Sequence, residues 1–314
     1  MKKRAALVLL GALLAIVVLP VLVAQLTRPE PVVRTPIELA SLTYEDVRYE
    51  NASQGVGLAG MLFVPDGEGP FPGVVMITGS GSFRRANSWY LNYARYLQAG
   101  GIAVLLPDKR GTEFSGGDWR TASLEDLASD TLAAISYLRT DRPGLASSIG
   151  VLGVSQGGVI VSIVASEAPD LAFAINVVGH AVPMNEQLRY EENNNLRQAG
   201  FLPGISNAIS YVSTFAIQNI VDRAWWSAVG NLDAVSYWDE VDAPTLVVYG
   251  DQDRNVPSAR SRDRLNALGK PNIQVVMFEG SDHGLEPPEG VAGEFQREDA
   301  LELIREFILG AAEE

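Results

Sequence analysis

Short apolar runs and amphipathic stretches alternate along most of this chain, and this alternation restricts the fold more than any other feature. Runs such as Gly73–Thr78 and Ile102–Leu106 are apolar throughout, which is typical of strands buried on both faces of a sheet. Apolar residues recur at helical spacing over Leu124–Arg139, and Ser123 is well placed to cap that helix. Strands that alternate with helices predict a mainly parallel sheet with helices on both faces, which is an α/β fold.

The predicted elements follow one another from residue 47 to residue 309. Strands are expected at Val47–Asn51, Leu58–Val64, Gly73–Thr78, Ile102–Leu106, Ser148–Gly153, Ala172–Val178, Thr245–Tyr249 and Ile273–Phe278. Helices are expected at Ala86–Ala99, Leu124–Arg139, Gly157–Glu167, Ala259–Leu268 and Gln296–Leu309. The first two strands have the pattern of a hairpin, which indicates an antiparallel edge to the sheet.

One segment interrupts this alternation. Between Ala181 and Ala243 no clear strand is present, whereas the apolar residues around Ile209 and Val212 recur at helical spacing. We therefore predict a helical cap, inserted over about residues 182–241. Its apolar stripe is expected to be buried against the rim of a substrate pocket.

The composition excludes several classes of function. The 314 residues are 47% apolar and 20% charged, so the chain can form a sizeable core. A net charge of −14 argues against nucleic acid and disfavours polyanionic substrates. The absence of cysteine excludes disulfides and thiolate nucleophiles, and the presence of only two histidines, His180 and His283, excludes a three-histidine metal site. We predict no cofactor and no metal, and the sequence does not indicate the oligomeric state.

The N-terminus has the pattern of an export signal or a membrane anchor. Three basic residues precede Ala5–Leu26, an almost wholly apolar run of about 22 residues, which is long enough to cross a hydrocarbon core of ~30 Å as a helix. We predict an uncleaved signal anchor at residues 1–26 with the catalytic domain outside the cytoplasm. The alternative is a cleaved signal and a secreted or periplasmic protein. Three prolines then predict a linker at 27–41, and the globular domain is expected at 42–314.

A candidate nucleophile lies between a predicted strand and a predicted helix. Gly153 to Gly157 match the pattern Gly-x-Ser-x-Gly, with Ser155 at its centre. In a strained strand-to-helix turn of this kind, side chains two positions either side of the serine would clash with neighbouring elements. The N-terminus of the following helix directs free N–H groups, beginning with that of Gln156, at the oxyanion that develops during acyl transfer.

Four segments carry a resemblance to a known group of proteins. They read GLAGMLFVP, VVMITGSGSFRR, GIAVLLPDKRGTEFSGG and IGVLGVSQGG. From about Leu42 to the C-terminus, the chain resembles the α/β-hydrolase superfamily. Within it, the segments resemble an esterase-like and acyl-thioesterase-like branch near the dienelactone hydrolase and prolyl oligopeptidase groups. The resemblance implies an eight-stranded sheet and a catalytic triad in the order Ser, acid, His.

The catalytic histidine has two candidates. His283 follows the last predicted strand, where the resemblance places the catalytic base, and a serine hydroxyl needs a neutral imidazole to accept its proton. His180 follows the strand Ala172–Val178, so it would lie on the same rim of the sheet. We predict His283 as the base and His180 as a residue that lines the pocket.

The catalytic acid is expected in the loop after the strand Thr245–Tyr249. The resemblance implies Asp253, within a Gly-x-x-Asp-like arrangement, and leaves Asp251 as an alternative that could instead accept backbone hydrogen bonds in a turn. Asp282 is disfavoured because side chains of adjacent residues rarely face one another.

Two neighbouring loops complete the predicted site. The resemblance implies that the backbone N–H of Ser80 pairs with that of Gln156 to form the oxyanion hole; an ordinary Gly/Ser turn is the alternative for this loop. Arg84 and Arg85 are interpreted as solvated surface charge, with an anion-binding role as the alternative. The resemblance assigns Asp108 and Arg110 to the scaffold.

These features predict a serine hydrolase that cleaves a small-molecule carboxylic ester or thioester through an acyl-enzyme intermediate. A serine peptidase, an acyltransferase and a non-catalytic binding protein are the alternatives. The cap is expected to set acyl specificity, with Trp225 and Trp226 adding apolar area to the pocket. In the alternative arrangement, the cap helices pack on the sheet away from the site.

Overall fold

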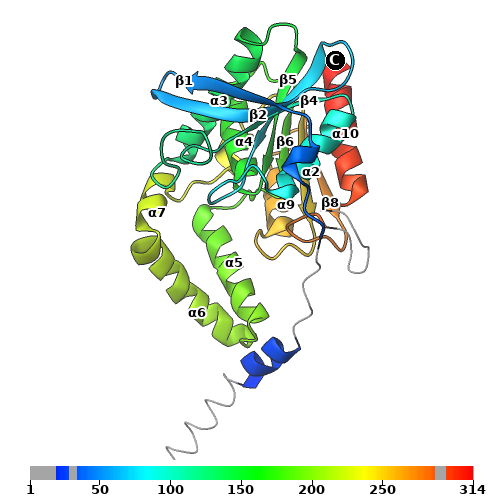
Figure 1. Cartoon of the computed structure of the whole chain (residues 1–314). Helices are drawn as coiled ribbons and strands as arrows, with labels where there is room; N and C mark the ends of the chain where they lie inside the picture. Colours follow the sequence, from blue (N-terminus) through cyan, green and yellow to red (C-terminus); the bar gives the residue numbers. More distant parts are fainter. Residues whose placement is uncertain (1–18, 28–33, 287–294, 314) are drawn as a thin grey trace, which may run out of the picture.

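An eight-stranded sheet runs through the centre of the protein (Figure 1). The computed structural model describes residues 19–27, 34–286 and 295–313. The strands are β1 (Glu45–Asn51), β2 (Val56–Phe63), β3 (Phe71–Ile77), β4 (Ala103–Pro107), β5 (Ala146–Val154), β6 (Ala174–Val177), β7 (Thr245–Gly250) and β8 (Ile273–Phe278), in the spatial order β1-β2-β4-β3-β5-β6-β7-β8. β2 pairs antiparallel with β1 and β4, whereas the other neighbours pair in parallel. The predicted parallel sheet with an antiparallel edge is therefore confirmed.

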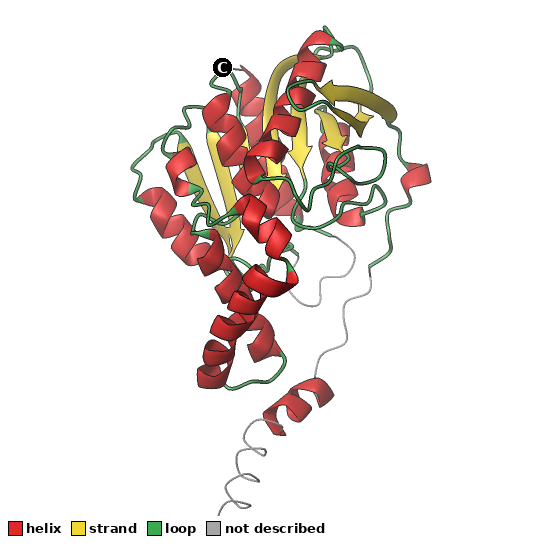
Figure 2. Ribbon diagram, turned by 90° about the vertical axis from the view of Figure 1, so that its left-hand side faces the viewer, coloured by secondary structure: helices red, strands yellow, loops and turns green. Residues whose placement is uncertain are grey.

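Helices cover both faces of this sheet, as Figure 2 shows. One face carries α2 (Ser88–Ala99) and α10 (Glu298–Glu313); the other carries α3 (Leu124–Thr140), α4 (Gln156–Glu167), α8 (Val235–Trp238) and α9 (Ser258–Asn266). Successive residues of β3 contribute to opposite cores: Val74 packs with α2 and α10, and Val75 packs with α3 and α4. The uninterrupted apolar strands of the sequence are thus explained by burial on both sides.

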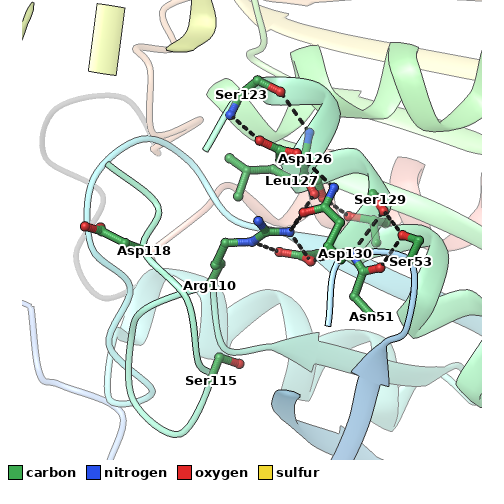
Figure 3. A network of polar contacts seen from close by, with 12 residues as sticks. Asn51, Ser53, Arg110, Ser115, Asp118, Ser123, Asp126, Leu127, Ser129 and Asp130 are labelled. Carbon is green, nitrogen blue, oxygen red and sulfur yellow. Dashed lines mark hydrogen bonds and ion pairs between the residues drawn. The ribbon is translucent and has the colours of Figure 1, made fainter. Parts of the chain in front are cut away.

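A polar network fastens the loop after β4 to its surroundings (Figure 3). Arg110 donates to both carboxylate oxygens of Asp130 on α3, at 2.8 and 2.7 Å. Asn51 at the end of β1 donates to the same carboxylate at 2.8 Å. At the start of α3, Ser123 and Asp126 form the reciprocal bonds of a capping box, as the predicted N-cap requires. The loop that follows β4 is therefore held by buried charge pairs, which agrees with a scaffold role for Arg110.

The part of the segment between β6 and β7 that precedes α8 is helical and stands away from the sheet (Figure 1). It contains α5 (Met184–Gln198), α6 (Pro203–Ala216), a π-helical turn η2 (Ile217–Val221) and α7 (Arg223–Val229). The buried residues of α6 are small and polar, namely Ser206, Ser210 and Thr214, whereas Val212 is 69% exposed. The expectation of a buried stripe is therefore wrong at Val212, because α6 packs against α5 through its small side chains. The limits of the cap stay a prediction.

The predicted N-terminal anchor needs correction. None of the helices in residues 19–27, 34–286 and 295–313 combines the length and the apolar character that crossing a membrane requires. Residues 1–18 of the predicted anchor lie outside the described residues. The predicted membrane-spanning anchor is thus wrong for the described chain. The predicted membrane-anchored location depends on that anchor and is therefore wrong as well.

A short 3-10 helix, η1 (Leu39–Ser41), lies within the predicted linker. Ile37 and Leu39 pack against the core formed by α2 and α10, and the N–H of Ile37 donates to the Ser88 hydroxyl at 2.9 Å. The end of this segment is therefore attached to the domain, and the boundary near residue 42 stays a prediction.

Candidate active site

Ser155 occupies a sharp turn between β5 and α4. Its backbone angles are φ 57° and ψ −120°, a strained conformation that a residue other than glycine rarely adopts. A Cβ atom on Gly153 would lie 2.1 Å from the carbonyl oxygen of Gly157, and one on Gly157 would lie 2.1 Å from that of Ile77. Only glycine fits at these two positions, so the motif reflects the close approach of β3, β5 and α4.

Three side chains from three loops form a continuous hydrogen-bonded chain. His283 Nε2 lies 3.0 Å from Ser155 Oγ, and His283 Nδ1 lies 2.8 Å from Asp253 Oδ2. The second carboxylate oxygen of the buried Asp253 accepts the N–H groups of Asn255 and Val256, at 2.8 and 2.9 Å. The carboxylate is thereby held in one orientation toward the imidazole.

The two competing aspartates have other partners. Asp251 accepts the N–H of Gly280 at 2.8 Å, and Asp282 accepts the N–H of Gly284 at 2.9 Å. Both stabilise the loop that carries His283 and neither is hydrogen-bonded to the imidazole among the described residues. The geometry therefore brings only Asp253, of the three, into the chain of hydrogen bonds.

The environment of His283 favours its protonated form. Burial by itself lowers its pKa, but the hydrogen bond to Asp253 and the charges of Asp253 and Glu191 outweigh this effect, so the pKa lies above its ordinary value. Trp89 Nε1 donates to the carbonyl of Gly284 at 3.2 Å and helps to hold the histidine loop. A raised pKa makes the His283 imidazole a stronger base than an ordinary histidine.

His180 lies on the same rim but in a different environment. Its Nδ1 donates to the carbonyl of Val182 at 2.8 Å, and its Nε2 lies 3.1 Å from Met184 Sδ. Burial lowers the pKa of His180 to about 4, so the ring is neutral at neutral pH. The structure places His180 beside the cavity without a hydrogen bond to Ser155.

The loop after β3 passes close to the serine. A Cβ atom on Gly79 would lie 3.3 Å from Ser155 Cβ, and the N–H of Gly79 donates to the Tyr90 hydroxyl at 2.8 Å. Among the described residues, the backbone N–H groups of Ser80 and Gln156 have no acceptor within the protein. Both residues border the same cavity as Ser155, so these two N–H groups stay the predicted oxyanion donors.

A cavity of about 680 Å³ opens above Ser155. The structure brings all the residues predicted for the pocket to its wall, namely Ser80, Gln156, His180, Trp225, Trp226 and His283. The rings of Trp225 and Trp226 meet edge to face at 5.0 Å. The cap helices α5 and α7 and the turn η2 therefore face the site, rather than packing on the sheet away from it.

Comparison with known proteins agrees with this arrangement. The sequence profile of the family described as "BAAT / Acyl-CoA thioester hydrolase C terminal" matches residues 132–290, just over half of the chain. The chain belongs to this family. The resemblance to the α/β-hydrolase superfamily is thereby confirmed.

Individual relatives have low sequence identity to this chain. The chain is 27% identical to acyl-coenzyme A thioesterase 3 of Mus musculus over 72% of its length and 50% of the thioesterase. It is 25% identical to esterase EstD of Thermotoga maritima over 74% of its length and 59% of the esterase. The chain thus spans about half the length of these relatives. The solved Pyrococcus furiosus esterase Pf2001 covers 90% of the chain with a TM-score of 0.65 at 18% identity, over 97% of the esterase, which shows a shared fold.

One interpretation of charge in this α/β-hydrolase needs correction. Arg85 is only 6% exposed, and its guanidinium donates to both carboxylate oxygens of Asp108, at 2.8 and 2.9 Å, and also to Asp46. It is therefore a buried scaffold residue rather than a solvated surface charge. Arg84 is exposed, as expected. The sequence does not distinguish the two adjacent arginines, because the burial of Arg85 depends on Asp108, which is 23 residues away.

Sequence reasoning also missed several residues of the cavity wall. Trp89, Trp119 and Glu191 border the cavity, and burial raises the pKa of Glu191. Lys109 is buried beside the loop after β3, although the sequence motif that contains it indicates only a scaffold. These residues lie outside the superfamily's catalytic motifs. The one available sign in the sequence was Lys109 itself, a lysine just after the end of an apolar strand.

Proposed function

We propose that this protein hydrolyses a carboxylic ester or thioester through an acyl-enzyme formed on Ser155. The single observation that supports this most strongly is the chain of hydrogen bonds from Asp253 through His283 to Ser155 at the base of the cavity. Family membership supports the same conclusion, since the family description and the printed names of relatives refer to thioesterases and esterases.

The geometry supports a two-stage reaction. Ser155 Oγ attacks the acyl carbonyl while His283 Nε2 accepts its proton, and Asp253 stabilises the imidazolium that forms. The N–H groups of Ser80 and Gln156 donate to the oxyanion. The imidazolium then protonates the departing alcohol or thiol. A water molecule, deprotonated by the same imidazole, attacks the acyl-enzyme and releases the acid.

The cap forms the remaining wall of this reaction chamber. Trp225 and Trp226 supply apolar surface for the acyl chain, and α5 and α7 limit the access of water to the acyl-enzyme. We infer that acyl-chain preference is set by these helices rather than by the strand ends that carry the triad.

The charges around the cavity favour a leaving group without phosphates. Among the described residues of its wall, the ionisable side chains other than the two histidines and Tyr90 are the carboxylates of Glu191 and Asp222 and the guanidinium of Arg120. Lys109 lies nearby, but its ammonium is occupied by protein acceptors. A polyphosphate-bearing leaving group would find few cations here, whereas a neutral alcohol or thiol needs none.

A fluorophosphonate probe tests the proposal directly. We expect the full chain to be labelled, and Ser155→Ala to lose both labelling and hydrolysis of p-nitrophenyl esters while keeping its circular dichroism spectrum. Ser136→Ala, an exposed serine on α3, is the matched control and should behave as the wild type. Labelling of Ser155→Ala at the wild-type rate would contradict the assignment, and an unlabelled wild type would favour a binding protein.

Substrate series separate the finer alternatives. The same acyl group should be compared as a p-nitrophenyl ester, an N-acetylcysteamine thioester and a coenzyme A thioester. We expect kcat/KM for the coenzyme A thioester to be no higher than for the phosphate-free thioester, and a clear preference for the former would contradict the charge argument. Added alcohols that divert the product to a new ester would instead indicate an acyltransferase.

A further inference from the structure

Lys109 is a buried cation that the mechanism above does not use. It lies in the loop after β4, is 7% exposed, and forms no ion pair with a carboxylate among the described residues. Its ammonium donates to the carbonyl of Gly79, to that of Gly81 at 3.1 Å, and to Gln156 Oε1 at 3.4 Å. All three N–H groups of the ammonium are therefore directed at neutral oxygens.

These acceptors surround the two predicted oxyanion donors. Ser80 lies between Gly79 and Gly81, so the ammonium holds the carbonyl on each side of it. The third acceptor is the side chain of Gln156, the residue that supplies the other donor. One side chain thus connects the loop after β3 to the N-terminus of α4, the two segments whose relative position determines the width of the oxyanion hole.

We propose that Lys109 is a positioning residue that holds the two halves of the oxyanion hole in register. The inference rests on the proposed function, because the hole matters only if Ser155 forms an oxyanion. Lys109 acts through Ser80 and Gln156 and does not itself touch the substrate. A misplacement of about 1 Å in such a site is enough to lower the rate on the order of 100-fold.

The side chain of Gln156 supplies an independent observation. Its Nε2 is buried without a hydrogen-bond partner in the described structure, although the residue borders the cavity. Because an ammonium only donates, Lys109 requires the amide oxygen to face it, which directs the NH₂ group elsewhere. An unpaired buried donor is costly unless a ligand accepts from it. The orientation set by Lys109 therefore leaves a second donor of Gln156 available to a bound substrate.

The positioning depends on the charge of Lys109. Burial lowers the pKa of Lys109 to about 7, and a neutral amine has only two N–H groups for three acceptors. Deprotonation above this pH removes one of the three bonds. Two charged neighbours of Lys109 along the chain are already paired, Asp108 with Arg85 and Arg110 with Asp130. The other charged or titratable groups nearby are Tyr90 on α2, Arg120, and His283 beyond Ser155. The Trp119 ring covers the ammonium at 5.9 Å.

Two substitutions test this role by the pH dependence of kcat/KM. In the wild type, activity requires a neutral His283 and a charged Lys109. Because the pKa of His283 is raised and that of Lys109 is lowered to about 7, the two transitions overlap, and the profile should be a narrow bell with an alkaline fall. Lys109→Met should lower kcat on the order of 10- to 100-fold with little change in KM, and its profile should lose the alkaline fall. Lys109→Arg keeps a charge at every accessible pH, so it should retain more activity than Lys109→Met and should also lose the alkaline fall.

Controls separate this inference from the proposed function. Lys270→Met removes a lysine that does not border the cavity and should keep the wild-type profile. Fluorophosphonate labelling of every variant shows whether Ser155 is present and folded. A labelled Lys109→Met with wild-type kcat and an unchanged alkaline fall would overturn the inference and leave the function standing. If Lys109→Met does not fold, an unchanged alkaline fall in Lys109→Arg would overturn it, and an unlabelled wild type would overturn both proposals.

Discussion

The floor and the roof of the cavity are built differently. The floor, which comprises Ser155, Asp253 and His283 on loops at the ends of strands, is held by hydrogen bonds to and among these loops. The roof, which comprises α5, α6, η2 and α7, leaves large apolar side chains exposed: Phe215 is 63% exposed and Ile220 is 72% exposed. The floor is thus constrained at almost every polar atom, whereas much of the roof meets solvent.

The contrast also shows how the two parts are joined. On α5, the Tyr190 hydroxyl donates to the carbonyl of Asp253 at 2.8 Å, and Gln187 donates to the carbonyl of Asn255 at 2.9 Å. The roof is therefore attached through α5 to the loop of the floor that carries Asp253, while α6 extends outward. We expect substitutions in the floor to act on kcat, and substitutions in the roof to act on substrate preference.

The two histidines give the largest expected difference. His283→Ala removes the proposed base, and we expect kcat to fall on the order of 10⁶-fold. His180→Ala removes a neutral ring that contacts Val182 and Met184, so we expect less than about a 10-fold loss, together with a lower thermal stability. Steady-state kinetics of both variants on one ester checks this, and a reversed order would move the base to the rim after β6.

The acid loop provides the next test. In Asp253→Asn, the amide oxygen should keep the N–H groups of Asn255 and Val256, which turns the NH₂ group toward His283. The imidazole would then carry its proton on the nitrogen that faces Ser155 and could not accept another. We expect kcat to fall about 10⁴-fold with the fold intact.

Asp251→Asn is the matched control for that substitution. Asp251 accepts a hydrogen bond from Gly280 and not from His283, and an amide oxygen can replace it in this role. We expect a loss of less than about 10-fold, measured under the same conditions. Equal losses in the two variants would leave the acid unassigned and would show that the floor tolerates less change than its hydrogen bonds indicate.

The roof should give the smallest effect on rate and the clearest effect on selectivity. Trp225→Ala removes half-buried apolar area from the cavity wall, so we expect the preferred acyl length to shift by a few carbons while kcat on the best ester changes less than about 10-fold. Trp226 belongs to the core and its loss would also destabilise the fold, so Trp225 is the better probe. Phe215→Ala, an exposed residue of the same cap, is the control.

A p-nitrophenyl ester series of increasing chain length provides the measurement. An unchanged ranking in Trp225→Ala, identical to that of Phe215→Ala, would show that the roof is scaffold only. In that case, acyl preference would have to be sought among the residues of the floor.

The sequence constrains the floor closely because close packing and backbone geometry leave few alternatives there. Gly153 and Gly157 can be no other residue beside Ile77 and the start of α4, so the motif carries the geometry with it. Apolar strands buried on two faces likewise leave an uninterrupted pattern. The sequence constrains the roof less, since helical spacing identifies a face of α6 without showing which face is buried. Val212 lies on the exposed side.

The sequence alone determined the alternation of strands and helices and the position of Ser155, because each depends on residues close together in the chain. It also limited the candidate bases to two histidines, because the chain contains no others. Only the tertiary structure decided which aspartate meets His283, that Arg85 is buried against Asp108, and that Lys109 connects the loop after β3 to the start of α4. Each of these contacts joins loops that are distant in sequence, and a side chain's burial and partners follow from packing that local patterns do not encode.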